Sequence, residues 1–467
     1  MPFTSSATTT LPRTVRAVAL GRGISFLGDE VALLAMAFRA KAELGHFGVA
    51  AILIAGAVPL LVLVPFAGLL VDRIATRPLL VAVTLAQAGL CVALAWAPAG
   101  LLVPLIALLA CGTAVSSPAW QALLPTLVDP TDLPRALGAM QSFAACAGLA
   151  GPFLGGFLVA TYGFHVPLLI DAASFAALAA VPLVMRLNRV PEGTARSFSF
   201  HEAFAGVRLV VQHPVIRSLL AHLTLFVLAL GVINVVEIYF ITTALHAGPR
   251  GYGLLGVCFG GGMLVTSSLA GRLSRRFPRP ERPFVVGCAA LCVGIGAFGL
   301  TSQLWEAAVL LVFVGAANAI INVNAMVMIT THSTDEIRGR VFSAIQGTIS
   351  AAQILALATG GLLLLAVQPR PIIVVGALAS ALALSATVGP VLRAGRTAER
   401  SPSEDEPIGA AELDVSWSAP AGGRRRDAHR GLWRNGDPGA PRHDRVPLAR
   451  LGGIVPFPLE RRRPRDR

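Results

Sequence analysis

The sequence predicts an all-α, polytopic membrane protein with twelve transmembrane helices in two six-helix pseudo-repeats. First, 55% of the 467 residues are hydrophobic and only 13% are charged, whereas soluble domains average about 45–50% apolar and about 25% charged residues. Second, the apolar residues form runs of about twenty residues, the length that spans a bilayer. Third, the two halves repeat a set of residues at an offset of about 205 positions. A soluble enzyme, a disulfide-rich secreted domain and a disordered regulator are excluded as the main body.

The apolar segments appear in order along the chain, six before a polar, Arg-containing connection and six after it. The first segment holds Asp29 and Glu30 and is too long for a cleaved signal peptide. The predicted spans are 15–38, 47–71, 78–97, 101–127, 136–160, 164–185, 216–243, 252–273, 284–302, 306–330, 341–366 and 371–393. The predicted parts are an N-terminal segment 1–14, bundles 15–185 and 216–393, a linker 186–215 and a tail 394–467.

The tail 394–467 differs in composition from the spans. It is rich in Arg, Pro and Gly and contains no apolar run long enough to cross a bilayer. Such a composition cannot bury enough apolar surface to fold. We therefore predict a disordered cytoplasmic extension.

The connections between segments orient the chain, because cytoplasmic loops of membrane proteins are enriched in Arg and Lys. With the N-terminus inside, the cytoplasmic connections hold roughly four times as many Arg and Lys residues as the outer ones. The outer connections contain Arg39, Lys41, Arg250 and Arg370. Both termini are therefore predicted to be cytoplasmic, in a cell membrane of the bacterial inner-membrane type. The net charge of +13 does not indicate nucleic-acid binding, because the charges of the body lie in short connections.

The internal repeat rests on ordered matches between the halves. At one offset, four residues of the first half have identical partners in the second, namely Arg135, Gln141, Gly155 and Gly156 with Arg340, Gln346, Gly360 and Gly361. At an offset of 203, the stretches beginning at Gly68 and Gly271 match as G-x-L-x-x-R. Two six-span halves in one orientation, joined by a cytoplasmic linker, are typical of transporters.

Two motifs resemble those of the major facilitator superfamily. The stretch 68–77 resembles the family motif between the second and third spans, with departures at Ala75 and Thr76. The stretch 148–156 in the fifth span resembles the motif of the antiporter branches, with Ala147 where a leading Gly is expected. The matching residues are Gly68, Asp72, Arg73 and Arg77 in the first motif and Gly148, Gly151, Pro152, Gly155 and Gly156 in the second. The resemblance covers about residues 13–393 and implies the major facilitator fold.

Three further stretches, 22–29, 118–125 and 338–341, resemble the subgroup of enterobactin exporters and macrolide efflux proteins. This resemblance implies a drug:proton antiporter. The Arg that drug antiporters carry in the fourth span is absent from 101–127. We expect Arg22 to take its part in proton release if the mechanism is shared.

The two motifs have different physical roles in this interpretation. Asp72 can pair with nearby Arg residues or face a helix N-terminus, so the first motif is interpreted as a cytoplasmic gate; a plain solvated turn is the alternative. The glycines of the second motif allow close helix approach, and Pro152 bends the segment. We interpret that segment as a tightly packed pivot, with simple helix packing as the alternative.

Ionisable residues inside membrane helices are functional candidates because they are costly to bury. Arg22, Ser25 and Asp29 lie on one helical face. Asp29 is the first candidate for proton coupling and Glu30 the second, with Arg22 as a further candidate. Glu237, three residues after Asn234 in the seventh span, is a candidate for coupling or for substrate binding. A structural network between Arg22 and a carboxylate is the alternative. Asp171 is expected near the outer end of the sixth span, as an interfacial acid or a further functional group.

Polar side chains within the other spans are candidates for the substrate cavity, although hydrogen bonding between helices explains them equally well. They are Ser25, Thr113, Ser117, Gln121, Gln141, Asn234, Asn318, Asn322 and Gln346. The small number of charges favours an amphipathic or lipophilic substrate. No nucleotide motif, catalytic triad or metal-ligand cluster occurs, so no enzyme, cofactor or metal is predicted. His222, His332 and the six cysteines are interpreted as structural.

The sequence as a whole predicts a secondary active exporter that exchanges protons for a small amphipathic molecule, such as a drug, an antibiotic or a siderophore. An uncoupled facilitator or importer is the alternative within transport. A membrane sensor on the same fold is the alternative outside it. The expected partners are the lipid bilayer, protons and the small-molecule substrate, with no nucleic acid, and the expected state is a monomer.

Overall fold

A computed structural model describes residues 12–71, 73–129, 132–187, 214–276, 280–331 and 335–400. Within these ranges the chain forms α-helices and two short 3-10 turns, and no strand occurs. The helices of the first half are α1 (Arg13–Glu43), α2 (Gly48–Val71), α3 (Thr76–Trp96), α4 (Ala99–Leu123), α5 (Leu133–Tyr162) and α6 (His165–Val184). Those of the second half are α8 (Pro214–Leu230), α9 (Ile233–Thr243), α10 (Pro249–Arg276), α11 (Glu281–Leu300), α12 (Leu304–Thr331), α13 (Asp335–Leu363) and α14 (Pro369–Arg400).

The helices coincide with the predicted apolar segments, with two differences. The seventh segment is broken at Gly231 and Val232, so that it forms α8 and α9. The last helix continues past the predicted end at residue 393 to Arg400. Eleven helical segments of the described ranges are long and apolar enough to cross a membrane, and α8 with α9 counts as one of them. The 31-residue helix α1 is about 46 Å long, and it stands outside that set because it carries Arg22, Asp29 and Glu30.

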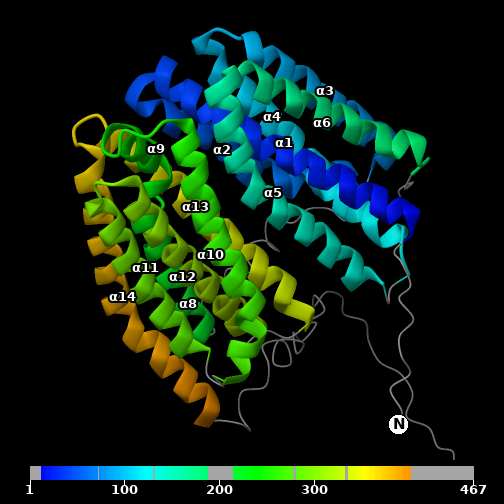
Figure 1. The fold of residues 1–467 in the computed structure, drawn as a ribbon. Helices are drawn as coiled ribbons and strands as arrows, with labels where there is room; N and C mark the ends of the chain where they lie inside the picture. The colour runs from blue at the N-terminus through cyan, green and yellow to red at the C-terminus, as the bar shows by residue number, and fades with distance from the viewer. Residues whose placement is uncertain are drawn as a thin grey trace, which may run out of the picture. The chain divides into compact units, whose positions relative to one another are not determined.

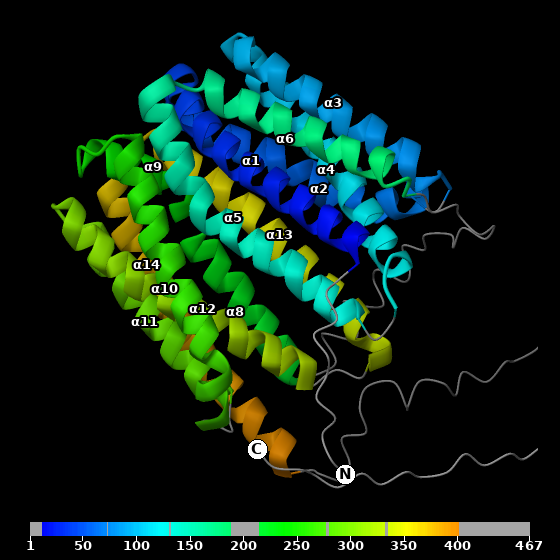
Figure 2. The same cartoon turned by 45° about the vertical axis from the view of Figure 1, so that its right-hand side comes forward.

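The helices pack mainly within their own half, as Figure 1 shows for α1–α6 in blue to green-cyan and α8–α14 in green to orange. In the first half, α1 packs against α5 and α6, and α2 against α4. In the second half, α10 and α11 pack against α12, and α14 packs against α8 and α11. The halves meet where α5 packs on α10 and α13 packs on α2, and the turned view in Figure 2 shows the same grouping.

The repeated glycines occupy equivalent crossings in the two halves. A Cβ atom on Gly155 would meet α1, and one on Gly360 would meet Val232 at the α8–α9 break. A Cβ atom on Gly156 would meet α10, and one on Gly361 would meet α2. In each half, therefore, the first glycine packs within the half and the second packs against the other half. Small residues at these crossings let the backbones approach closely.

The outer surface of the helices is apolar, as expected of a protein surrounded by lipid. Large side chains such as Val293 and Leu382 are more than 70% exposed. Soluble proteins rarely expose apolar patches of such extent. The chain is therefore a multi-pass membrane protein.

Candidate functional site

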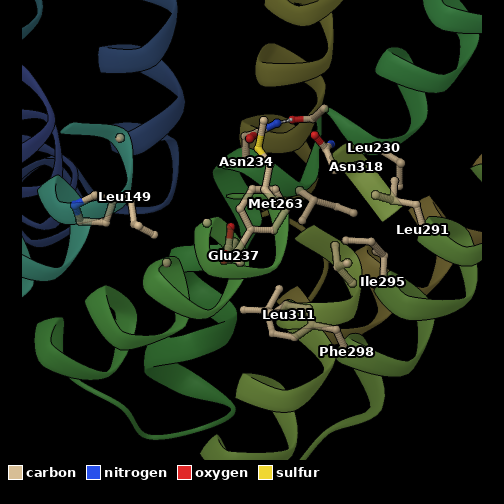
Figure 3. Close-up of a pocket in the computed structure, with 18 of the residues that line it drawn as sticks. Leu149, Leu230, Asn234, Glu237, Met263, Leu291, Ile295, Phe298, Leu311 and Asn318 are labelled. Atoms are coloured by element: carbon tan, nitrogen blue, oxygen red, sulfur yellow. Dashed lines mark hydrogen bonds between the residues drawn. The ribbon is translucent and has the colours of Figure 1, made fainter. Parts of the chain in front are cut away.

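A cavity of about 670 Å³ lies among α5 and the helices α8–α13, and Figure 3 shows its wall. Most of the wall is apolar, and its larger side chains include Phe226, Phe259, Met263 and Phe298. Its polar side chains are Asn234, Glu237, Tyr252, Ser267, Asn318 and Gln353. Cavities of roughly 300–1,000 Å³ hold drug-sized molecules in other proteins. The size and mixed lining make this cavity the candidate binding site.

The break in the seventh span positions two of the polar side chains. Gly231 lies against α13, where an added Cβ would come within 2.8 Å of the Cβ of Ala356. The side-chain amide of Asn234 donates to the Gly231 carbonyl over 3.2 Å. Glu237 lies three residues further along α9, on the same helical face, and both side chains line the cavity in Figure 3. The broken helix thus presents an amide and a carboxylate to the cavity, as broken helices do in other transporters.

Two more amide side chains reach the cavity from α12 and α13. Asn318 lines it and accepts a hydrogen bond of 2.6 Å from the side chain of Asn322. Asn322 does not line the cavity, so it supports Asn318 from one helical turn away. Gln353 also lines the cavity, beside Gly231. Sequence reasoning did not single out Gln353, although it is a polar residue inside the apolar segment 341–366.

The glycine motif of α5 connects the cavity with both halves. Gly148 and Pro152 line the cavity. A Cβ on Gly151 would collide with the Cβ of Glu30 in α1. On the opposite face, a Cβ on Gly253 of α10 would lie 2.5 Å from the carbonyl oxygen of Pro152. Helix α5 is therefore packed tightly between α1 of its own half and α10 of the other.

The ionisable residues of α1 lie outside the cavity wall. The guanidinium of Arg22 lies over the rings of Phe26 and Trp120, 4.7 and 6.0 Å from their centroids. Its Nε atom is buried without a hydrogen-bond partner. Asp29 interacts electrostatically with Arg22 and with Asp171. Arg22 and Asp29 form no direct ion pair. Among the described residues, Arg39 and Glu43 form an ion pair, with 2.8 Å between Nε and Oε1.

Asp171 lies near the start of α6 (His165–Val184), as expected, but inside the protein and not at its surface. It is completely buried, with an exposed fraction of 0%, because it sits in the second turn of α6 against Gly28 of α1. A Cβ on Gly28 would lie 2.6 Å from an Asp171 carboxylate oxygen. The carboxylate accepts hydrogen bonds from the Cys91 thiol over 3.3 Å and the Ser174 hydroxyl over 3.2 Å. Of the two alternatives, this burial disfavours the interfacial acid, and a functional role for Asp171 stays a prediction.

Tyr252 connects the cavity with α1. It lines the cavity and interacts electrostatically with Glu237 and with Glu30. Its ring stands edge-on to that of Phe38, with 5.8 Å between the centroids. Tyr252 thus interacts with a carboxylate of each half, Glu237 in the second and Glu30 in the first. Sequence reasoning missed it because an aromatic residue in an apolar span carries no distinguishing signal.

The remaining polar candidates do not line the cavity. Thr113 accepts a hydrogen bond of 3.0 Å from Gln87 of α3, so it joins two helices. Ser25 is buried within the first half. Ser117 is half-buried outside the cavity. Gln121, Gln141 and Gln346 are exposed and also lie outside it. Of the predicted substrate contacts, Asn234 and Asn318 are therefore the two that line it.

His222, His332 and the six cysteines are interpreted as structural. His222 is buried, with Nδ1 2.6 Å from the Thr387 hydroxyl and Nε2 3.3 Å from the Cys288 sulfur. These contacts join α8 to α14 and α11. His332 lies outside the described residues. No group of three potential metal ligands occurs in the part of the chain that the structure describes.

The predicted gate motif is described only in part. Gly68 lies in the last turn of α2, and Asp72 lies outside the described residues. Arg73 is exposed. Arg77 lies in the first turn of α3, and its guanidinium lies 3.4 Å from the carbonyl oxygen of Leu183 at the end of α6. The gating role of the motif stays a prediction.

Polar contacts join the halves at the end that the Arg and Lys bias predicts to be the outer one, here called the predicted outer end. The hydroxyl of Tyr239 in α9 donates to the carbonyl of Gly45 over 2.8 Å. The ammonium of Lys41 in α1 donates to the Thr242 hydroxyl and lies 5.5 Å from the centroid of the Tyr239 ring. The His46 ring stacks on Tyr239, with 6.2 Å between the centroids. Together these residues form one contact, the Tyr239 contact.

A second set of contacts at this end joins α5 to α10. Arg250 donates to the Thr161 hydroxyl over 3.2 Å, and its guanidinium lies 5.5 Å from the centroid of the Phe157 ring. Gly361 of α13 packs against Phe47, the residue just before α2. The two halves therefore meet closely around the predicted outer end.

Solved structures of transporters share this fold. A peptide transporter of the POT type has a TM-score of 0.69 and 12% identity, with 84% of this chain and 96% of that chain covered. A POT family transporter in complex with 5-aminolevulinic acid has a TM-score of 0.65 and 13% identity, covering 84% and 98%. The nucleoside transporter NupG has a TM-score of 0.67 and 11% identity, covering 81% and 100%. At these identities the likeness concerns the fold.

Sequence relatives are MFS-type transporters. The uncharacterized MFS-type transporter YfiS of Bacillus subtilis (strain 168) is 27% identical over 357 residues, which are 73% of this chain and 84% of the relative. The uncharacterized MFS-type transporter y4rN of Sinorhizobium fredii (strain NBRC 101917 / NGR234) is 28% identical over 228 residues, 47% and 56% of the two chains. The model of the family described as transmembrane secretion effector matches residues 24–414. With the all-helical fold of the described residues and the cavity among the helices, this match places the chain in the transmembrane secretion effector family of MFS-type membrane transporters.

Proposed function

We propose that the protein is a secondary active exporter of a small amphipathic molecule, driven by exchange with protons. The observation that carries this proposal is the cavity of about 670 Å³, whose apolar wall and clustered polar groups suit a molecule with both kinds of surface. The family description, transmembrane secretion effector, supports the outward direction. Drugs, antibiotics and siderophores are the substrates to test first. The proposed location is a bacterial-type inner membrane, with both termini in the cytoplasm.

Proton coupling is proposed from the carboxylates inside the helices. A carboxylate is costly in a membrane and is retained there for a function. Asp29 is the proposed proton carrier, because it lies in the electrostatic reach of both Arg22 and Asp171. Two neighbouring carboxylates disfavour each other's ionisation, whereas a nearby Arg favours it. A shift of Arg22 relative to Asp29 would therefore change the affinity of Asp29 for a proton.

Alternating access requires contacts that hold one end closed and then release. The Tyr239 contact joins the halves at the predicted outer end. In the proposed cycle it breaks when the cavity opens outward, and the gate motif at 68–77 closes the opposite end. The close crossing of α5 with α1 and α10 serves as the pivot between the two states.

The proposal is tested in an efflux-deficient bacterial host. Wild type and Asp29→Asn are produced at matched membrane levels, and accumulation of fluorescent drugs and siderophores is followed with and without an uncoupler. Lower accumulation with wild type, abolished by the uncoupler and by the substitution, supports proton-driven export. Glu306→Gln is the matched control, because this half-buried carboxylate lies outside the cavity and accepts backbone N–H groups at the start of α12.

Two other outcomes separate the alternatives. Uptake or efflux that ignores both the uncoupler and Asp29→Asn indicates an uncoupled facilitator. No effect on any compound contradicts the export proposal and favours a non-transporting sensor.

A further inference from the structure

The ionisable side chains that line the cavity are acidic and not basic. Among the described residues that line it, Glu237 is the one carboxylate, and none is Lys, Arg or His. The amides of Asn234, Asn318 and Gln353 orient a ligand but carry no net charge. When Glu237 is ionised, the cavity therefore has a single negative charge and no cation of its own.

The Glu237 carboxylate has no protein partner that would satisfy this charge. In the described part of the chain it makes no hydrogen bond and no ion pair, and no Arg or Lys interacts with it electrostatically. Its electrostatic neighbour is the Tyr252 hydroxyl, which is neutral. A buried charge without a partner is costly. The carboxylate is consequently free to bind a proton or a cationic ligand.

The rest of the wall suits the apolar part of such a ligand. Figure 3 shows Glu237 and Met263 on one side of the cavity and Leu311, Ile295 and Phe298 gathered on another. Aromatic faces attract cations as well as apolar groups. An anionic ligand of the same size would meet a repulsive charge and no basic side chain among these lining residues.

We propose, building on the proposed export function, that the cavity selects singly charged cationic amphiphiles. The cationic group lies at Glu237, and the apolar body packs among the aromatic and aliphatic side chains of α10–α12. Asn234, on the same face of α9, supplies a neutral hydrogen-bonding group beside the carboxylate. Glu237 is therefore the residue that determines charge specificity.

The test measures binding to the full-length protein in lipid nanodiscs, without a proton gradient. Tetraphenylphosphonium and tetraphenylborate are ions of the same shape and opposite charge, and binding is measured by equilibrium dialysis against empty nanodiscs. Wild type is expected to bind the cation, and to bind it more tightly than the anion. Glu237→Gln is expected to weaken cation binding roughly ten- to a hundredfold, the order expected for losing the Coulomb attraction between two unit charges in a protein.

Two variants keep the test specific. Glu237→Asp retains the charge and is expected to retain preference for the cation, which separates loss of charge from misfolding. Glu306→Gln makes the same chemical change on a side chain of α12 that does not line the cavity and is expected to bind as wild type does. Equal binding of the two ions, no binding of tetraphenylphosphonium, or full cation binding by Glu237→Gln overturns the inference.

The result of this binding test does not depend on whether the protein exports its ligand. Charge-selective binding without efflux in the bacterial host leaves the inference standing and contradicts the export function. Proton-driven efflux together with equal binding of the two ions supports the export function and overturns the inference of charge selectivity.

Discussion

Tyr239 offers a direct test of how the two halves are held together. Its side chain is 4% exposed, and its hydroxyl donates to the Gly45 carbonyl of the other half over 2.8 Å. Gly45 has a φ angle of +70°, a conformation that glycine adopts readily, so its carbonyl is held toward the tyrosine. Tyr239→Phe keeps the ring against Lys41 and His46 and removes the hydrogen bond.

The expected magnitude follows from that single bond. A net intramolecular hydrogen bond contributes about 0.5–1.5 kcal/mol, and about 1.4 kcal/mol corresponds to a tenfold change in an equilibrium constant. Because the bond joins the halves, its loss destabilises the state that is closed at the predicted outer end. The equilibrium between the closed and open states is expected to shift roughly two- to tenfold toward the open state.

The assay uses the fact that Lys41 is the only lysine of the chain. The ammonium of Lys41 is part of the same contact, so separation of the halves exposes it. Purified protein in nanodiscs is treated with an amine-reactive ester, and peptide mass spectrometry separates Lys41 from the N-terminal amine. Tyr239→Phe is expected to raise the rate of Lys41 modification by the same two- to tenfold factor.

Thr243→Val is the matched control for this measurement. The Thr243 hydroxyl donates within its own helix, to the Tyr239 carbonyl over 2.7 Å, so the substitution leaves the contact between the halves intact. If Tyr239→Phe modifies Lys41 no faster than wild type and Thr243→Val do, the Tyr239 contact does not hold the halves together.

Two further predictions concern stability and movement. Arg39→Ala is expected to destabilise the protein by about 3 kcal/mol, because the guanidinium donates to the Leu94 and Ala97 carbonyls over 2.6 and 2.5 Å. Thermal unfolding checks this, with Glu43→Gln, which keeps both carbonyl bonds, expected to lose less than about 1 kcal/mol; equal losses would contradict it. Gly151→Leu is expected to abolish efflux at a matched membrane level, because α5 cannot then approach α1 at Glu30. Gly138→Leu in the same helix has open space around it, and equal activity of the two variants would exclude the pivot.

The spans were predictable because a membrane helix must be apolar over about twenty residues. The break in the seventh span was not, because Gly231 is one glycine among many and only its packing against Ala356 shows why the helix bends there. The burial of Asp171 was hidden for a similar reason. Its partner Cys91 lies in α3, 80 positions away in the sequence, and a carboxylate near a helix end is otherwise placed at the surface.

The candidate site was predicted in part. Asn234 and Glu237 are spaced three residues apart, so the helical period placed both on one face, and both line the cavity. Gln141 and Gln346 match in the repeat, yet their side chains are exposed outside the cavity. Equivalence in a repeat predicts equivalent positions on a helix. It does not predict which positions face a cavity, because the described cavity is lined by only one helix of the first half, α5.

The capping of two equivalent helices shows how far the symmetry of the repeat extends. The end of α3 is bound by Arg39 of α1, whose guanidinium lies 4.4 Å from the centroid of the Phe164 ring next to α6. The end of α11 is bound by Arg370 of α14, which donates to the Thr301 carbonyl over 2.8 Å and lies 5.8 Å from the centroid of the Phe240 ring of α9. The cation and the aromatic ring have exchanged helices between the halves.

This exchange has a simple physical reason. The carbonyl end of a helix is stabilised by any nearby cation, and two neighbouring helices can supply it equally well. Close crossings of backbones are more demanding, because at Gly156 and Gly361 a Cβ would collide with the opposite half. The duplicated halves therefore keep their glycines in register while their charged side chains diverge.

At the offset of about 205, Asp29 of the first half corresponds to Asn234 of the second, and the second half has its carboxylate at Glu237 instead. Divergence of this kind allows one half to carry a proton while the other binds a cation, without altering the helix crossings on which both depend.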